Sequence, residues 1–377
     1  MPTSAWLPAS LEAKGIGRAL RHSPLGLIET EGIFVSLTLT VHAGAAPVHP
    51  RRWFLRALVA GFFALVLLLA PLPIAATAAT QGATPTPAAC AVAATPGAAA
   101  ATFPLTITDD AGRQVMFAQP PQRIVSIAPS NTEILYALGL ADRVVAIDSY
   151  SNYPPEAAAK PLVGDYLEPD LESVVAAEPD LILAADVHLG TVLPELDTLD
   201  LPTVVFAPAN LDEVFASILQ VGVIAGEPAR AAELVCELQA RVDAVTAAIV
   251  GAPRPRVFFE LDPGLYTVGP GTFVADVIAR AGGENIAAAA AEMWPQLSAE
   301  AIVAANPEVI LLADEVAGVT PEQVAARPGW QGIAAVEQDR IVPIDPDLVA
   351  RPGPRVVDGL EEVAAALHPD RFPEAAS

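Results

Sequence analysis

A thirteen-residue stretch occurs twice in this chain, first as Leu171-Glu-Ser-Val-Val-Ala-Ala-Glu-Pro-Asp-Leu-Ile-Leu183 and then, 128 positions later, as Ala299-Glu-Ala-Ile-Val-Ala-Ala-Asn-Pro-Glu-Val-Ile-Leu311. Each copy combines a helical pattern that ends before a proline with a short apolar run, and each carries a glutamate in its first turn, Glu172 or Glu300. A short, uninterrupted apolar run is typical of a strand buried on both faces of a parallel sheet. The repeat therefore predicts two related halves, each built from helices and a parallel sheet.

The segments around both copies follow the same alternation of strand and helix. Apolar strands that alternate with helical patterns predict an α/β fold, with two similar lobes whose central parallel sheets are flanked by helices. Residues 228–250 contain no internal glycine or proline after Pro228 and have apolar side chains at helical spacing, so they predict one long helix that joins the lobes. The predicted strands lie at 123–127, 144–147, 181–183 and 204–206, and then at 256–259, 309–312 and 341–344.

We therefore expect an N-terminal lobe at 103–227, a connecting helix at 228–250 and a C-terminal lobe at 251–377, with a ligand cleft between the lobes. Residues 80–102 consist mainly of alanine, threonine, proline and glycine. Such a segment has too few large apolar side chains to offset the loss of chain entropy on folding. It is predicted to be a linker.

Residues 51–79 have the order of an export signal. Arg51, Arg52 and Arg56 form a basic head, which is followed by an uncharged apolar run and a small-residue exit. Because the uncharged stretch is long enough to cross a bilayer, a cleaved signal and an uncleaved membrane anchor both stay open. Cys90 leaves lipidation open beside a plain linker cysteine. Residues 1–50 precede a signal that belongs at an N-terminus, so we interpret them as a spurious extension of a protein exported to the periplasmic or extracellular face of the cell membrane.

Charge and reactive side chains limit the classes of function. The formal net charge of −24 disfavours binding to nucleic acid. Two cysteines, Cys90 and Cys236, form neither a disulfide framework nor a metal knuckle, and the two histidines of the exported part, His188 and His368, are too few for a bare metal ion. No Gly-x-Ser-x-Gly motif is present. A metal-dependent enzyme on a two-lobed scaffold is therefore only the competing hypothesis from another class.

Aromatic residues in the predicted loops point to a ligand site instead. Tyr150 and Tyr166 follow strands of the first half, and Tyr266 and Trp294 occupy loops of the second half. Parallel sheets bind ligands at the loops that follow their strands. The four side chains either form flat apolar walls for a large ligand or pack beneath their own loops.

Two pairs of charged residues each have two interpretations. Arg351 and Arg355, in Arg-Pro-Gly-Pro-Arg, either hold an anionic group of a ligand or pair with acidic neighbours. Glu172 and Glu300 either interact with the dipoles of their helices or serve as paired acidic docking points on two equivalent lobes.

Five segments make residues 104–369 resemble the iron-chelate and cobalamin class of ABC-importer binding proteins, and most closely its cobalamin-binding members. The resemblance implies a rigid, non-catalytic, two-lobed protein without a cofactor of its own, which captures a corrinoid and hands it to a membrane permease powered by an ATPase. A ferric siderophore or haem is the alternative ligand, and we expect a monomer. The segments lie at 123–133, 149–155, 282–285, 294–300 and 351–355.

The resemblance also implies roles for individual residues. Glu172 and Glu300 fall on glutamates that engage arginines of the permease. Ala185 stands where the cobalamin binders have a cleft tryptophan, which frees space for a corrinoid precursor, haem or a ferric siderophore. His188, three residues on, is expected to be a solvated loop histidine, with ligand contact as the alternative. The residues at ligand-contacting positions are Tyr150, Tyr166, Tyr266, Trp294, Asp347 and Arg351.

Overall fold

The computed structural model describes residues 101–314 and 318–373. The predicted signal or anchor at 51–79, Cys90 and nearly all of the predicted linker lie outside these ranges. Within them, no helix is both long enough and apolar enough to cross a membrane.

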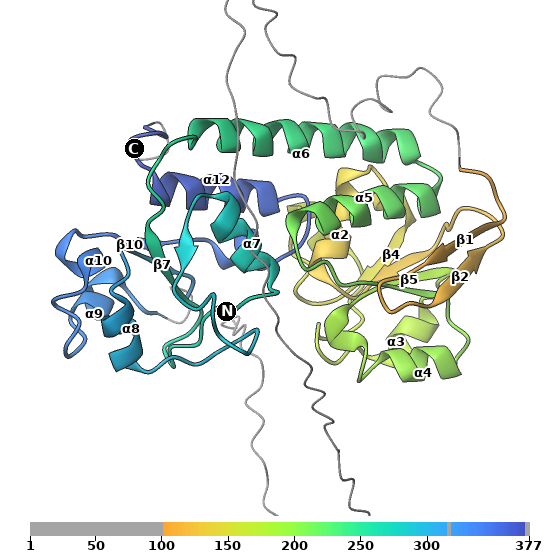
Figure 1. Cartoon of the computed structure of the whole chain (residues 1–377). Coiled ribbons are helices and arrows are strands. Elements are labelled where there is room, and N and C mark those ends of the chain that lie inside the picture. Colours follow the sequence, from red (N-terminus) through yellow and green to blue (C-terminus); the bar gives the residue numbers. More distant parts are fainter. Residues whose placement is uncertain (1–100, 315–317, 374–377) are drawn as a thin grey trace, which may run out of the picture. The chain divides into compact units, whose positions relative to one another are not determined.

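The N-terminal sheet has four parallel strands in the order β4-β3-β5-β6. Alternate side chains of its strands enter two separate apolar clusters, because successive residues of a strand point to opposite faces. In Figure 1, α2 and α5 lie on one face of this sheet and α3 and α4 on the other. The strands are β3 (Ile124–Ser126), β4 (Val144–Ile147), β5 (Leu181–Ala185) and β6 (Thr203–Phe206), and the helices are α2 (Pro129–Ala137), α3 (Leu171–Ala176), α4 (Leu193–Thr198) and α5 (Leu211–Ala225).

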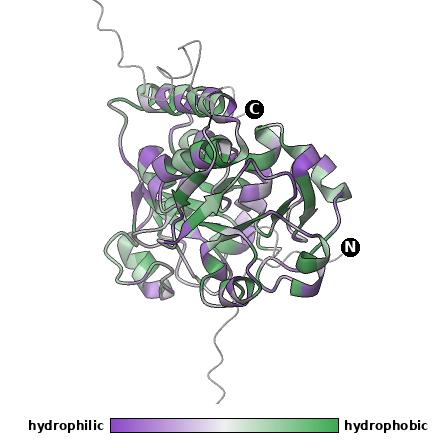
Figure 2. Ribbon diagram, turned by 90° about the vertical axis from the view of Figure 1, so that its right-hand side faces the viewer, coloured by the Kyte–Doolittle hydropathy of each residue, from purple (hydrophilic) through white to green (hydrophobic). Residues whose placement is uncertain are grey.

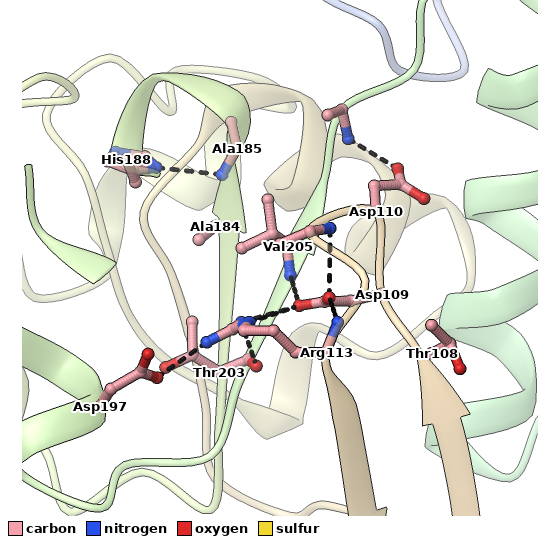
Figure 3. A network of polar contacts seen from close by, with 12 residues as sticks. Thr108, Asp109, Asp110, Arg113, Ala184, Ala185, His188, Asp197, Thr203 and Val205 are labelled. Atoms are coloured by element: carbon pink, nitrogen blue, oxygen red, sulfur yellow. Dashed lines mark hydrogen bonds and ion pairs between the residues drawn. The ribbon is translucent and has the colours of Figure 1, made fainter. Parts of the chain in front are cut away.

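A hairpin that the sequence did not predict precedes this sheet. Strands β1 (Leu105–Thr108) and β2 (Gln114–Phe117) pair antiparallel. The buried carboxylate of Asp109, at the turn, accepts hydrogen bonds from the Arg113 side chain and from the Val205 amide of β6 at 3.2 Å. This carboxylate ties the hairpin to the edge of the sheet (Figure 3).

The C-terminal sheet is also parallel, in the order β10-β9-β7-β8. Figure 2 shows strands in green, the apolar colour, whereas the helices carry both colours, as expected for buried strands under amphipathic helices. The predicted α/β fold with parallel sheets flanked by helices is confirmed. The strands are β7 (Arg256–Glu260), β8 (Glu284–Asn285), β9 (Val309–Leu312) and β10 (Ile341–Pro343), and the helices are α7 (Phe273–Arg280), α8 (Ala299–Ala305), α9 (Pro321–Ala325), α10 (Ala334–Glu337), α11 (Pro346–Val349) and α12 (Val356–Leu367).

One long helix, α6 (Pro228–Ala248), connects the two sheets along the chain. It packs against α5 of the first half and α12 of the second, and one apolar cluster includes residues of both sheets. Gly222 makes the contact between α5 and α6 possible, because a Cβ atom there would lie 2.3 Å from the Cβ of Ala231. Cys236, on α6, is disulfide-bonded.

Candidate functional site

Two of the predicted ligand residues lie on neighbouring loops of the C-terminal sheet. Tyr266 follows β7 and forms an isolated antiparallel bridge with Gln296, and the amide of Thr267 donates to the carbonyl of Pro295 at 3.0 Å. This pairing brings the segment of Tyr266 beside that of Trp294. Their side chains are 38% and 42% exposed, which is high for large aromatic residues.

The other two aromatic residues lie on neighbouring loops of the N-terminal sheet. Tyr150 follows β4, and the amide of Ser149 donates to the carbonyl of Gly164 at 2.8 Å, two residues before Tyr166. Both tyrosines are half-buried. Burial raises the pKa of the Tyr166 phenol, and the nearby carboxylates of Asp186 and Asp148 raise it further.

His188 is not the solvated loop histidine that the sequence suggested, because it is 0% exposed. Its Nδ1 accepts a hydrogen bond from the amide of Ala185 at 3.0 Å (Figure 3), and its Nε2 lies 2.7 Å from the carbonyl oxygen of Tyr166. The imidazole also packs edge-on against the Tyr166 ring, with centroids 5.5 Å apart and planes at 82°. The imidazole can be buried because both of its ring nitrogens have a backbone hydrogen-bond partner, so no polar atom is left unsatisfied.

Arg351 and Asp347 meet at the end of α11 and reach the loop of Tyr150. The guanidinium of Arg351 contacts the carboxylate of Asp347 at 2.8 Å and donates to Oδ1 of Asn152 at 2.7 Å. Asn152 is two residues after Tyr150, so this bond links the C-terminal segment to the N-terminal sheet. The side chain of Arg351 is only 4% exposed, whereas that of Asp347 is 29% exposed.

Arg355 pairs with an acidic residue that sequence reasoning missed. It donates to both oxygens of Glu133, on α2, at 3.0 and 2.6 Å. Burial raises the pKa of Glu133, although Arg355 and Arg351 act in the opposite direction. The sequence feature that could have indicated Glu133 is its position as an acidic residue inside the apolar pattern of α2. A charge that is buried there requires a partner of opposite charge. Both arginines of the Arg-Pro-Gly-Pro-Arg segment thus contact acidic side chains, Arg351 that of Asp347 and Arg355 that of Glu133.

A second buried polar group lies under the Tyr150 loop. The carboxylate of Asp148 accepts a hydrogen bond from Ser151, whose Oγ lies 2.7 Å from Oγ1 of Thr132. Thr132 donates in turn to Ser126 on β3 at 2.8 Å. Burial raises the pKa of Asp148 to about 6. Hydrogen-bonded networks of this kind rigidify the loops that they support.

The two predicted docking glutamates occupy equivalent positions. Glu172 lies in the first turn of α3 and Glu300 in the first turn of α8, and both are exposed. The helices begin at N-cap side chains, Asp170 and Ser298, which accept hydrogen bonds from backbone amides of the first turn. Hydrogen bonds from the Glu300 backbone and Ser298 lower the pKa of Glu300.

The C-terminal ends of these two helices are also held in the same way. Glu178 and Asn306, equivalent residues of the repeat, both have φ of 48°. Arg123 donates to the carbonyls of Ala177 and Glu178, and Arg256 donates to those of the residues at 305 and 306. Arg123 directly precedes β3 and Arg256 begins β7, the first strand along the chain in each sheet. The sequence repeat therefore includes equivalent side-chain contacts, in which an arginine holds the C-terminal end of each helix that carries a glutamate.

The site offers surfaces for binding rather than groups arranged for metal chemistry. Among the residues that the structure describes, no three histidine, cysteine or acidic side chains gather as a metal site. His368 is buried, with its Nε2 at 3.0 Å from the carbonyl oxygen of Ala281. What the arrangement provides is two pairs of aromatic residues at the ends of parallel strands, with charged groups beside one pair.

A comparison with protein-family models matches residues 124–348 to a family described as periplasmic binding protein. Among similar proteins, an uncharacterised ABC transporter substrate-binding lipoprotein, YvrC, of Bacillus subtilis is 36% identical over 72% of this chain and 88% of its own length. A cobalamin-binding protein of Halobacterium salinarum is 31% identical over 71% of this chain and 75% of its own length.

A solved structure with a similar fold is a periplasmic haem-binding protein, RhuT, of Roseiflexus sp. RS-1, in its apo form. The superposition has a TM-score of 0.60 and 29% sequence identity, and it covers 66% of this chain and 99% of RhuT.

Proposed function

Because the chain belongs to the periplasmic binding protein family and is a substrate-binding protein of the ABC-importer type, we propose that it captures cobalamin or a related corrinoid outside the cell and delivers it to a membrane permease. The observation that carries this proposal is the presence of exposed or half-exposed aromatic residues at loops of both parallel sheets. The 31% identity to a cobalamin-binding protein supports the choice of ligand.

The aromatic residues suit a large, flat ligand. A tyrosine or tryptophan side chain buries about 150–250 Å² when it is fully covered. At about 25 cal/mol per Å² of apolar surface, covering what remains exposed of Tyr266 and Trp294 contributes on the order of 3–5 kcal/mol before the costs of association. Tyr150 and Tyr166 would supply the opposite wall of the same ligand site.

Asp347 and Arg351 would supply the polar contacts. Their ion pair lies beside the Tyr150 loop through the bond from Arg351 to Asn152. A carboxylate and a guanidinium can accept from and donate to the amide groups at the edge of a corrinoid. The few polar groups of a ligand site orient a ligand that apolar walls hold.

Glu172 and Glu300 would engage the permease. Both carboxylates are exposed, and both lie on helices that an arginine braces from the first strand of the sheet. Two equivalent acidic points on a repeated framework fit a roughly two-fold partner with basic groups, such as an ABC permease. Its ATPase would supply the energy for transport, and the N-terminal segment would keep the protein at the membrane.

A ferric chelate or haem is the second candidate ligand. The fold similarity to the haem-binding protein RhuT favours it.

Calorimetric titration of the purified chain tests the proposal directly. We expect one-to-one binding of cyanocobalamin and of dicyanocobinamide, and no comparable heat with haemin or ferrichrome. Trp294→Ala should weaken corrinoid binding at least tenfold. Leu199→Ala is the matched control, because Leu199 is similarly exposed, at 48%, but lies after α4 and away from the aromatic loops. Binding of haemin or ferrichrome alone would replace the corrinoid assignment with iron uptake.

A further inference from the structure

His188 is a buried histidine with no free ring nitrogen. Nδ1 faces the amide of Ala185, which can only donate, so Nδ1 must carry the lone pair. The proton is then on Nε2, which donates to the carbonyl oxygen of Tyr166 at 2.7 Å. The contacts therefore define one neutral tautomer.

The two backbone partners of His188 belong to different segments of the N-terminal sheet. Ala185 is the last residue of β5, and Tyr166 lies 22 positions earlier in the loop after β4. The imidazole thus bridges two loops at the carboxyl edge of the N-terminal sheet and packs edge-on against the ring of Tyr166. It occupies the neighbourhood of Ala185, the position at which the sequence suggested free space.

The hydrogen bonds of His188 conflict with metal coordination by its imidazole. A histidine binds a metal through a ring-nitrogen lone pair, and the only lone pair of His188 already accepts from Ala185. His188 would have to leave its present contacts before it could ligate a metal.

We propose that His188 is a positioning residue that holds Tyr166 in the wall of the ligand site and gives no ligand to the metal of the cargo. A cargo that carries its own metal ligands, as a corrinoid or a hexadentate ferric chelate does, therefore binds here without a bond from His188 to its metal. This inference rests on the proposed function and narrows its ligand class: a haem that needs an axial imidazole finds none at His188.

The environment of His188 adds a pH dependence. The charged group that acts on it is Asp186, on its own turn, and the ring of Tyr166 packs against it. Burial lowers the pKa of His188 below its ordinary value of 6.5. Protonation of Nδ1 would break the hydrogen bond from the Ala185 amide. The two hydrogen bonds of His188 are therefore intact at neutral pH and weaken only as the pH falls below the ordinary histidine pKa.

Spectroscopy of the wild-type protein, with His188→Phe as the check on any imidazole signal, tests the claim about metal ligation. Imidazole that displaces the water of aquocobalamin, or that binds haemin, changes the visible absorption spectrum. We expect the spectra of aquocobalamin and haemin mixed with the protein to show no imidazole ligation, and the ring nitrogens of ¹⁵N-labelled His188 to show the Nε2–H tautomer. An imidazole-ligated spectrum that disappears in His188→Phe would overturn the inference.

Affinity tests the positioning role. His188→Phe keeps a flat ring but removes both hydrogen bonds, so we expect cyanocobalamin to bind about tenfold more weakly at pH 7.5. We also expect wild-type affinity to fall as the pH is lowered below 6.5, and the affinity of the variant to fall less. His368→Phe is the matched control, since it removes a comparable buried bond to Ala281 away from the aromatic loops and should leave affinity unchanged.

Equal affinity of wild type and His188→Phe would refute positioning. Thermal unfolding of both histidine variants shows whether each is folded at the titration temperature. If no corrinoid binds the wild type, the corrinoid proposal fails, whereas the tautomer and the haemin spectrum still decide whether His188 is withheld from metal.

Discussion

Replacing Arg355 by methionine tests the buried ion pair between α2 and the start of α12. Arg355 donates to both oxygens of Glu133, whose side chain is 2% exposed. Removing one partner of a buried pair costs about 3–5 kcal/mol, because it leaves a buried charge without compensation. Arg351 stays 3.6 Å from Glu133, so we expect the lower part of that range, about 3–4 kcal/mol of the free energy of unfolding.

Arg241→Met is the matched control. Arg241 also contacts two carboxylates, those of Asp358 at 2.5 Å and Glu361 at 2.6 Å, but its side chain is 39% exposed and those of its partners are similarly exposed. Exposed ion pairs contribute about 0–1 kcal/mol, so the control should lose no more than that. Urea unfolding followed by circular dichroism measures both losses, through the midpoint and the slope of the transition.

The double variant Glu133→Gln with Arg355→Met completes the test. It removes both charges, so it should be more stable than Arg355→Met alone. The loss in Arg355→Met should also shrink as the pH is lowered toward 5. Burial already raises the pKa of Glu133 and Arg355 lowers it, so without Arg355 the carboxyl takes up a proton more readily in the folded state, which favours folding at low pH. Equal losses in Arg355→Met and Arg241→Met, or a strictly additive double variant, would refute the reasoning.

Three further predictions concern other parts of the molecule. Asp314→Asn should raise the melting temperature at pH 8 but hardly at pH 5. Both carboxylate oxygens of Asp314 lack a hydrogen-bond partner among the described residues, and burial, together with the charge of Glu260, raises its pKa to about 7. Ionisation of Asp314 therefore destabilises the folded state as the pH rises. Gly222→Ala should lower the free energy of unfolding by about 1–3 kcal/mol, because the new Cβ meets Ala231 on α6; an unchanged urea midpoint would contradict this packing. Charge reversal of both Glu172 and Glu300 should abolish uptake of labelled cyanocobalamin by cells while leaving the affinity of the purified protein unchanged, and a loss of affinity would contradict the docking role.

Local patterns in the sequence were enough to predict most of the architecture. The apolar runs at 181–183 and 309–312 are strands, and the helix expected at 228–250 is α6, Pro228–Ala248. These predictions succeed because periodicity, proline and glycine act within a few residues of chain. The hairpin of β1 and β2 escaped prediction because its strands are only four residues long and half exposed, which leaves little apolar pattern to read.

The internal repeat was equally informative, because two copies of one local pattern build two copies of one structure. It placed Glu172 and Glu300 at equivalent first turns, where the structure shows them. The arginine braces behind them were not predicted, since Arg123 and Arg256 lie about 50 positions from the carbonyls that they hold.

Tertiary structure alone determines which polar side chains near the site are buried and which partners they contact. The partner of Arg355 is 222 positions away in the sequence, and that of Arg351 in the Tyr150 loop is 199 positions away. The burial of His188 likewise depends on a carbonyl from another loop. Whether a charged or titratable group is solvated, paired or buried is determined by the elements that pack over it, and the sequence carries no local signal for that packing.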